Sequence, residues 1–150
     1  MEIKIIAIGN IKEKYLKQGI NNNLSKLQSK FTVQIIEINE YKLPQNPSDT
    51  EIKKGLEIEG AKIKDHIDKD SYLIVCDING KVFSSSHFKK ILTNQLYNYR
   101  KNITFIIGGS FGLDKSVLRK ANLKLSFGKM TFPHQLMRLI LIEQLTLLLI

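Results

Sequence analysis

The sequence predicts an α/β fold with a mainly parallel sheet and flanking helices. Short apolar runs typical of strands alternate with longer segments whose apolar residues recur at helical spacing. The runs 3–8 and 103–107 are almost continuously apolar, as in strands that are covered on both faces. With 150 residues, 43% of them hydrophobic, the chain is large enough for one substantial core. We therefore expect a single domain over residues 1–150.

The first half is expected to contain, in order, a strand, a helix, a strand, a loop and a helix: 3–8, 12–29, 31–38, 39–47 and 48–67. Pro44 and Pro47 indicate the loop. Ser48 and Glu51 match a capping box, which opens the second helix. The first helix presents one apolar face, made of Tyr15, Leu16, Ile20, Leu24 and Leu27.

The second half repeats the alternation as strand 72–76, turn 77–81, helix 84–100, strand 103–107, helix 113–120, strand 123–127 and a last helix. The pair Asn79-Gly80 indicates the turn, and a serine among residues 84–86 can cap the helix that follows. Pro133 is expected at the first position of the last helix, which proline favours.

Three loops of the second half are candidates for a ligand site. They begin at Asp77, Gly108 and Phe127, each directly after a strand. In open parallel sheets, ligands bind beyond the carboxyl ends of the strands. The first strand is followed by Gly9-Asn10-Ile11 and lacks a dinucleotide-binding fingerprint. We therefore expect the chemistry in the second half.

The two glycine-containing loops differ in how specific they are. The glycines of the first loop, Gly108, Gly109 and Gly112, fit a ligand site and a simple turn equally well. The second loop surrounds a helix start with polar groups. Its hydroxyl and amide groups suit adenine and ribose, and the helix N-terminus favours an anion. These polar residues are Lys129, Thr131, His134, Gln135 and Arg138.

His134 and Arg138 are the candidates for chemistry on a substrate. His134 is a general base, a nucleic-acid contact or a partly buried helix residue. Arg138 follows by four residues on the same helical face, where it extends a phosphate-binding surface or forms a surface salt bridge.

Other polar residues have structural alternatives. Asp77 either binds a ribose hydroxyl or shapes the turn, and Asp114 suits the start of a helix. Cys76 follows three apolar residues and is expected to be an inert buried thiol. With one cysteine and with His66 and His87 far apart, the sequence predicts no metal site.

Charge and composition indicate a polyanionic partner and a reducing compartment. The formal net charge is +9, which suits nucleic acid, although such a surface also aids solubility. A single cysteine and the lack of a secretory signal favour the cytoplasm. The apolar segment 139–150 is shorter than the roughly 20 residues of a membrane span. We expect no membrane association.

Four segments, 6–15, 76–85, 105–113 and 125–138, closely resemble the ribosomal large-subunit methyltransferase H family of the SPOUT superfamily. The resemblance covers about residues 1–145, and the block Lys-Met-Thr-Phe-Pro-His-Gln is specific to it. It implies S-adenosylmethionine as cofactor, and a C-terminal trefoil knot over about 72–150 that binds it. It also implies a homodimer. The implied reaction methylates N3 of a pseudouridine in 23S ribosomal RNA, on the large subunit or the assembled ribosome.

The resemblance also implies functions for individual residues. His134 and Arg138 take substrate-side roles, and His134 either accepts a proton or orients the base. The cofactor contacts carried over by position are Cys76, where the family usually has leucine, Gly108, Phe127, Gly128, Lys129, Met130, Thr131 and Phe132.

The sequence departs from the family after Leu145, where the family continues with tyrosine, arginine, alanine and a polar tail. We expect a chain that folds, dimerises and binds cofactor but methylates poorly. Two alternatives stay open: a catalytically impaired remnant that binds only ribosomes or cofactor, and a SPOUT methyltransferase that acts on transfer RNA.

Overall fold

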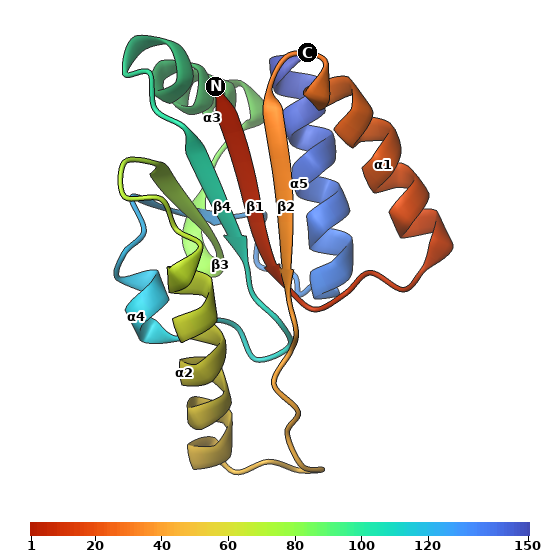
Figure 1. Ribbon diagram of the computed structural model, residues 1–150, viewed down its shortest axis with the longest axis vertical. Coiled ribbons are helices and arrows are strands. Elements are labelled where there is room, and N and C mark those ends of the chain that lie inside the picture. The colour runs from red at the N-terminus through yellow and green to blue at the C-terminus, as the bar shows by residue number, and fades with distance from the viewer.

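Every strand of the sheet runs parallel to its neighbours. The computed structural model describes residues 1–150 and orders the strands β2-β1-β4-β3-β5 (Figure 1). Strands β1 and β4 occupy the middle of the sheet, which explains why their sequences are almost wholly apolar. The predicted α/β class and the predominantly parallel sheet are confirmed. The strands are β1 (Glu2–Ile8), β2 (Thr32–Ile38), β3 (Tyr72–Val82), β4 (Ile103–Ile107) and β5 (Leu123–Ser126).

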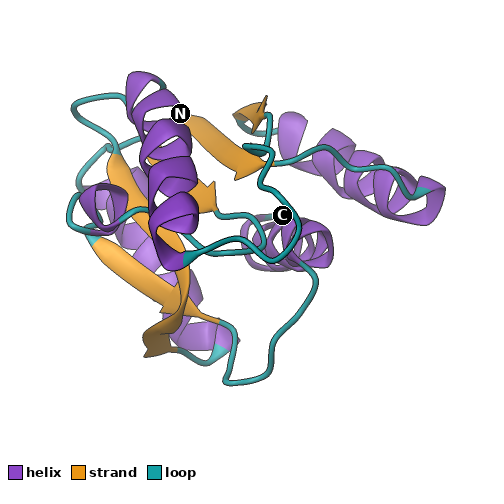
Figure 2. Ribbon diagram, turned by 90° about the horizontal axis from the view of Figure 1, so that it is seen from below, coloured by secondary structure: helices purple, strands orange, loops and turns teal.

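Helices cover both faces of this sheet (Figure 2). Residues of α1, α3 and α5 contribute to one buried cluster, and residues of α2 and α4 contribute to the other. The fold therefore has three layers. The helices are α1 (Lys14–Gln28), α2 (Asp49–Asp65), α3 (Ser85–Thr93), α4 (Lys115–Leu118) and α5 (His134–Leu149), and the π-helix η1 (Asn94–Asn98) continues α3.

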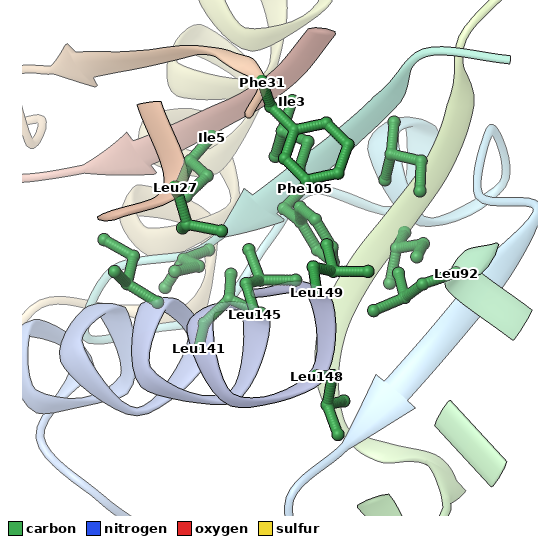
Figure 3. Packing of buried hydrophobic residues seen from close by; sticks show 14 of the residues in the cluster. Ile3, Ile5, Leu27, Phe31, Leu92, Phe105, Leu141, Leu145, Leu148 and Leu149 are labelled. Atoms are coloured by element: carbon green, nitrogen blue, oxygen red, sulfur yellow. The ribbon is translucent and has the colours of Figure 1, made fainter. Parts of the chain in front are cut away.

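The side chains of β1 alternate between the two layers. Ile3 and Ile5 belong to the cluster beneath α1 and α5, whereas Ile6 and Ile8 belong to the cluster beneath α2. Figure 3 shows the larger cluster, in which leucines of α5 meet Phe105 of β4. Burying such a side chain fully contributes about 1.5–3 kcal/mol, so α5 is held mainly by this apolar contact. No helix is both long and apolar enough to cross a membrane.

The turn predicted at 77–81 is wrong. Strand β3 continues to Val82, and its pairing with β5 shifts register between Cys76 and Lys81. The Asn79 amide donates a hydrogen bond to the Asp77 side chain at 3.0 Å, which shapes the irregular stretch. A Cβ on Gly80 would lie 2.6 Å from the carbonyl oxygen of Lys124, so glycine allows β3 to pass β5 closely.

Several helix boundaries also differ from the expected ones. The α-helix expected over 84–100 ends at Thr93 and is followed directly by the π-helix η1. The helix expected over 113–120 is shorter and forms only α4, Lys115–Leu118. Pro133 is the N-cap, because its ψ of 133° is extended, and His134 begins α5. Tyr15, which was predicted to lie on the apolar face of α1, is 67% exposed and does not belong to that face.

Candidate functional site

A pocket of about 290 Å³ lies beyond the carboxyl ends of β4 and β5 and beside the irregular stretch of β3. It is near the lower end of the range for small-molecule sites, about 300–1,000 Å³. The two predicted loops after β4 and β5 both line it, whereas the third contribution comes from residues within β3, where the predicted loop is part of the strand. The lining residues are Cys76, Asp77 and Ile78 from β3; Ile107, Gly108, Gly109, Gly112, Leu113 and Leu118 after β4; and Leu125, Ser126, Phe127, Gly128, Met130, Thr131, Phe132, His134 and Met137 after β5.

The loop after β4 folds back on itself at the pocket wall. The amide of Gly112 donates a hydrogen bond to the carbonyl oxygen of Gly109 at 3.1 Å. A Cβ on Gly108 would lie 2.7 Å from the Gly112 carbonyl oxygen, so the close approach that requires glycine is between two parts of this loop. Gly112 itself has a φ of +85°, which glycine readily adopts.

Ser126 fixes the loop between β5 and α5. Its buried hydroxyl donates a hydrogen bond to the Ile78 carbonyl oxygen at 3.1 Å and accepts one from the Gly128 amide at 3.1 Å. Gly128 has a φ of +124°, so the chain reverses there in a conformation that other residues rarely adopt. The loop is therefore joined to β3 directly beneath the pocket.

Most of the predicted cofactor contacts lie in this wall. Lys129 does not line the pocket and is exposed. Met130 lines it and is also 76% exposed, which places it at the rim. The other residues of the predicted set that line the pocket are Cys76, Gly108, Phe127, Gly128, Thr131 and Phe132.

Cys76 is partly buried in the pocket wall. This burial raises the pKa of the thiol to about 12. Cys76 is therefore a neutral, apolar part of the wall at physiological pH, as expected for an inert thiol.

His134 lies at the pocket end of α5 and packs against the turn that follows β1. Its Nε2 is 3.5 Å from the position that a Cβ would take on Gly9, whose φ is +93°. A glycine at the end of β1 thus leaves room for the imidazole. The ring is half-buried, so one side of it remains accessible from the pocket.

Arg138 does not line the pocket and is only 2% exposed. Its Nη1 lies 2.5 Å from Oε2 of Glu37, and its Nη2 donates to the Gly9 carbonyl oxygen at 3.0 Å. Of the two alternatives predicted for Arg138, the phosphate-binding surface is therefore wrong, and the salt bridge is found, although the arginine is buried and does not lie on the surface. The guanidinium is buried and hydrogen-bonds the Gly9 turn, which is also the turn that His134 contacts.

Sequence reasoning missed the residues that support the loops. Glu40 accepts a hydrogen bond from the Ser110 amide at 3.2 Å and thus holds the glycine loop from outside. Loops near the pocket are also held by hydrogen bonds of Glu37, Gly9 and Ser126. Of these residues, Glu37 could have been noticed in the sequence, because it is a charged residue within the otherwise largely apolar run of β2.

Asp114 lies at the start of α4, as its sequence position indicated. Its carboxylate accepts a hydrogen bond from the Ser116 amide at 3.2 Å and another from the Ser116 hydroxyl. These bonds lower the pKa of Asp114, and Lys64 on α2 lowers it further. Asp114 is therefore a helix cap beside the glycine loop.

The pocket combines apolar walls with exposed backbone groups and the carboxylate of Asp77. No group of three or more His, Cys, Asp and Glu side chains in the structure is arranged to hold a metal ion. A site of this kind can bind a mixed ligand with a flat heterocycle and a polar chain.

A family model described as a predicted SPOUT methyltransferase matches residues 1–146. The chain therefore belongs to the SPOUT methyltransferase family. It is similar to proteins named ribosomal RNA large subunit methyltransferase H from Enterococcus faecalis, at 46% identity, and from Carboxydothermus hydrogenoformans, at 45% identity. In both cases the alignment covers 97% of this chain and 91% of the relative. A protein of Methanococcus maripaludis named as a putative member is 46% identical over the same shares.

Proposed function

We propose that this protein uses S-adenosylmethionine to methylate N3 of a pseudouridine in the 23S ribosomal RNA of the large subunit. The observation that carries the proposal is one pocket that is lined by β3 and by the loops after β4 and β5, with His134 in its lining. Relatives named as large-subunit ribosomal RNA methyltransferases support the choice of RNA. The net charge of +9 agrees with a polyanionic substrate.

The chemistry of the pocket lining supports the proposed cofactor. S-adenosylmethionine supplies a methyl group on a positively charged sulfur. The apolar walls suit its adenine, and the neutral thiol of Cys76 adds no polar group that lacks a partner there. Gly108, Phe127, Gly128, Met130, Thr131 and Phe132 line the pocket, which supports their proposed contacts with the cofactor.

His134 is the proposed acceptor of the N3 proton. It is the histidine in the pocket lining, while His66 and His87 lie elsewhere. Bond formation at N3 requires that its proton leave, and histidine is the side chain that most often serves as a general base in enzymes. Arg138 is a positioning residue in this proposal, because it holds the Gly9 turn against which the imidazole packs.

The proposal includes a homodimer and a trefoil knot within about 72–150. Membership of the SPOUT family supports both. Leu147 of α5 is 69% exposed, and an apolar surface on this helix suits a second copy of the chain. The lone cysteine suits a cytoplasmic location.

The test is His134→Gln, with His66→Gln as the matched control. We expect His134→Gln to lower the rate of methyl transfer to ribosomes by about 10²–10⁴-fold. Calorimetry should show that cofactor affinity is retained, and His66→Gln should keep full activity. Unchanged transfer by His134→Gln would contradict the assigned role.

A further inference from the structure

The net charge of this protein is confined to one half of the chain. Residues 1–77 contain equal numbers of acidic and basic side chains, so the formal charge of +9 belongs entirely to 78–150. The stretch 78–113 contains no aspartate or glutamate. It includes α3, whose Lys89 and Lys90 present positive charge that no acidic neighbour in sequence offsets, and the uncharged η1.

One side of the α3–η1 segment is anchored and the other is free. Phe88, Leu92 and Leu96 are buried in the larger core cluster. The opposite side forms an open hollow, and its lining comes from this segment alone. We call this surface the basic aromatic face and define it by His87, Lys90, Asn94, Tyr97 and Asn98, and the exposed Tyr99 directly follows it in sequence.

The π-helix gives this face its aromatic character. The Tyr99 amide donates to the Asn94 carbonyl oxygen at 3.1 Å, five residues back, which widens the last turn. Tyr97 is 42% exposed and Tyr99 63%. The Nζ of Lys30 lies 5.8 Å from the centre of the Tyr97 ring, so a cation from the loop after α1 joins the face.

We propose that the basic aromatic face binds unpaired nucleotides of ribosomal RNA, as a second contact separate from the pocket. Exposed tyrosines offer stacking surfaces for unpaired bases, and the neighbouring cations suit the phosphates. Asn94 and Asn98 add amide groups that can hydrogen-bond base edges. The inference rests on the proposed function for the choice of RNA as the polyanion.

The placement of the face leaves the pocket open. Residue 98 ends η1 shortly before β4 begins at Ile103, whereas the pocket lies beyond the other end of β4. A strand of five residues spans roughly 16 Å. RNA held at the basic aromatic face therefore does not occupy the cofactor pocket, and a longer RNA can reach both.

The experiment measures fluorescence anisotropy of a labelled, unstructured single-stranded RNA of about twelve nucleotides, without cofactor. The variant Lys89→Ala/Lys90→Ala removes an exposed lysine pair from α3. The control Lys53→Ala/Lys54→Ala removes an equivalent exposed pair from α2, in the other helical layer. Net charge changes equally in both, so the comparison isolates the location of the charge.

We expect the α3 pair to weaken RNA binding about tenfold and to reduce its salt dependence, and the α2 pair to change it less than about twofold. Tyr97→Ala is expected to weaken binding about fivefold through lost stacking, with the exposed Tyr15→Ala as its control. The affinity for an RNA duplex of the same length should be unchanged in Tyr97→Ala, because paired bases cannot stack on the ring. Thermal unfolding verifies that all variants remain folded.

Equal effects of the two lysine pairs, or no RNA binding by the wild-type chain, would overturn the inference. Retained RNA affinity in Lys89→Ala/Lys90→Ala with lost affinity for an acidic peptide would assign the face to a protein partner instead and would also overturn it. The assay involves no methyl transfer. The proposed function can therefore fail while the basic aromatic face still binds RNA, and that result differs from a failure of this inference.

Discussion

Arg138 on α5 and Glu37 on β2 form an ion pair in which Nη1 lies 2.5 Å from Oε2, although 101 residues separate them in sequence. The same carboxylate oxygen accepts a hydrogen bond from the Ile11 amide at 3.3 Å, and the guanidinium also donates to Gly9. The pair thereby fixes the turn after β1 against the first turns of α5. This turn is the one that the proposed catalytic His134 contacts.

Replacing Glu37 by alanine should destabilise the fold. Removing one partner leaves the buried guanidinium without its counter-charge, which costs about 3–5 kcal/mol in a fully buried pair. The Glu37 side chain is 39% exposed, so solvent reduces the expected loss to about 2 kcal/mol. Urea unfolding measures it. Glu37→Gln, which retains a hydrogen-bond acceptor, should lose less, and equal losses would show that charge contributes nothing.

Gly108→Val should abolish cofactor binding while the chain stays folded. The new side chain would collide with the Gly112 carbonyl oxygen, so the loop must move at the pocket wall. We expect calorimetry with S-adenosylmethionine to show at least a tenfold loss of affinity, or about 1.4 kcal/mol. Ser110→Ala, which alters an exposed side chain of the same loop, is the control. Unchanged affinity in Gly108→Val would place the cofactor elsewhere.

The buried thiol of Cys76 should make stability fall in alkaline solution. The folded state keeps the thiol protonated up to a pKa of about 12, whereas the unfolded chain releases the proton near 9. The contribution of the protonated thiol to the free energy of unfolding is complete below pH 9. It is lost as the pH rises from there towards 12, by at most about 1.4 kcal/mol per pH unit.

Chemical denaturation at about pH 8 and about pH 10 tests this for wild type and Cys76→Ala. The wild-type chain should lose roughly 1 kcal/mol more than the variant between the two conditions. Parallel pH dependence in the two proteins would mean that the thiol is accessible to water.

Asp114→Ala should cost about 1 kcal/mol, the usual effect of losing a helix cap. Because the pKa of Asp114 is lowered in the fold, its contribution is present above the ordinary value of 3.8 and declines as the pH falls through the lowered one. Unfolding measured at neutral pH and in acid should therefore show a difference from wild type that shrinks in acid. A constant difference would mean that the cap acts without its charge.

The sheet could be predicted from sequence because its central strands are covered on both faces. Residues 3–8 and 103–107 must be apolar throughout for this reason, and that pattern is visible in a single sequence. The position of the pocket followed from a general rule about the carboxyl ends of parallel strands. The loops after β4 and β5 were therefore identifiable before their contacts were known.

The register shift in β3 was not predictable from local signals. The Asn79 amide does form a local hydrogen bond with the Asp77 side chain, but the chain then pairs again with β5, where Lys81 lies opposite Leu125. The burial of Arg138 was hidden for a similar reason. Spacing places it on the face of His134, yet only tertiary packing decides that this part of the helix meets Glu37.

The most direct test of the proposed function is methyl transfer by the chain itself. The protein is incubated with radiolabelled S-adenosylmethionine and ribosomes from cells that lack the modification, and the labelled nucleotide is then located. The account predicts label on N3 of a pseudouridine in 23S ribosomal RNA. Label on transfer RNA alone, or no label while the cofactor is bound, would contradict it.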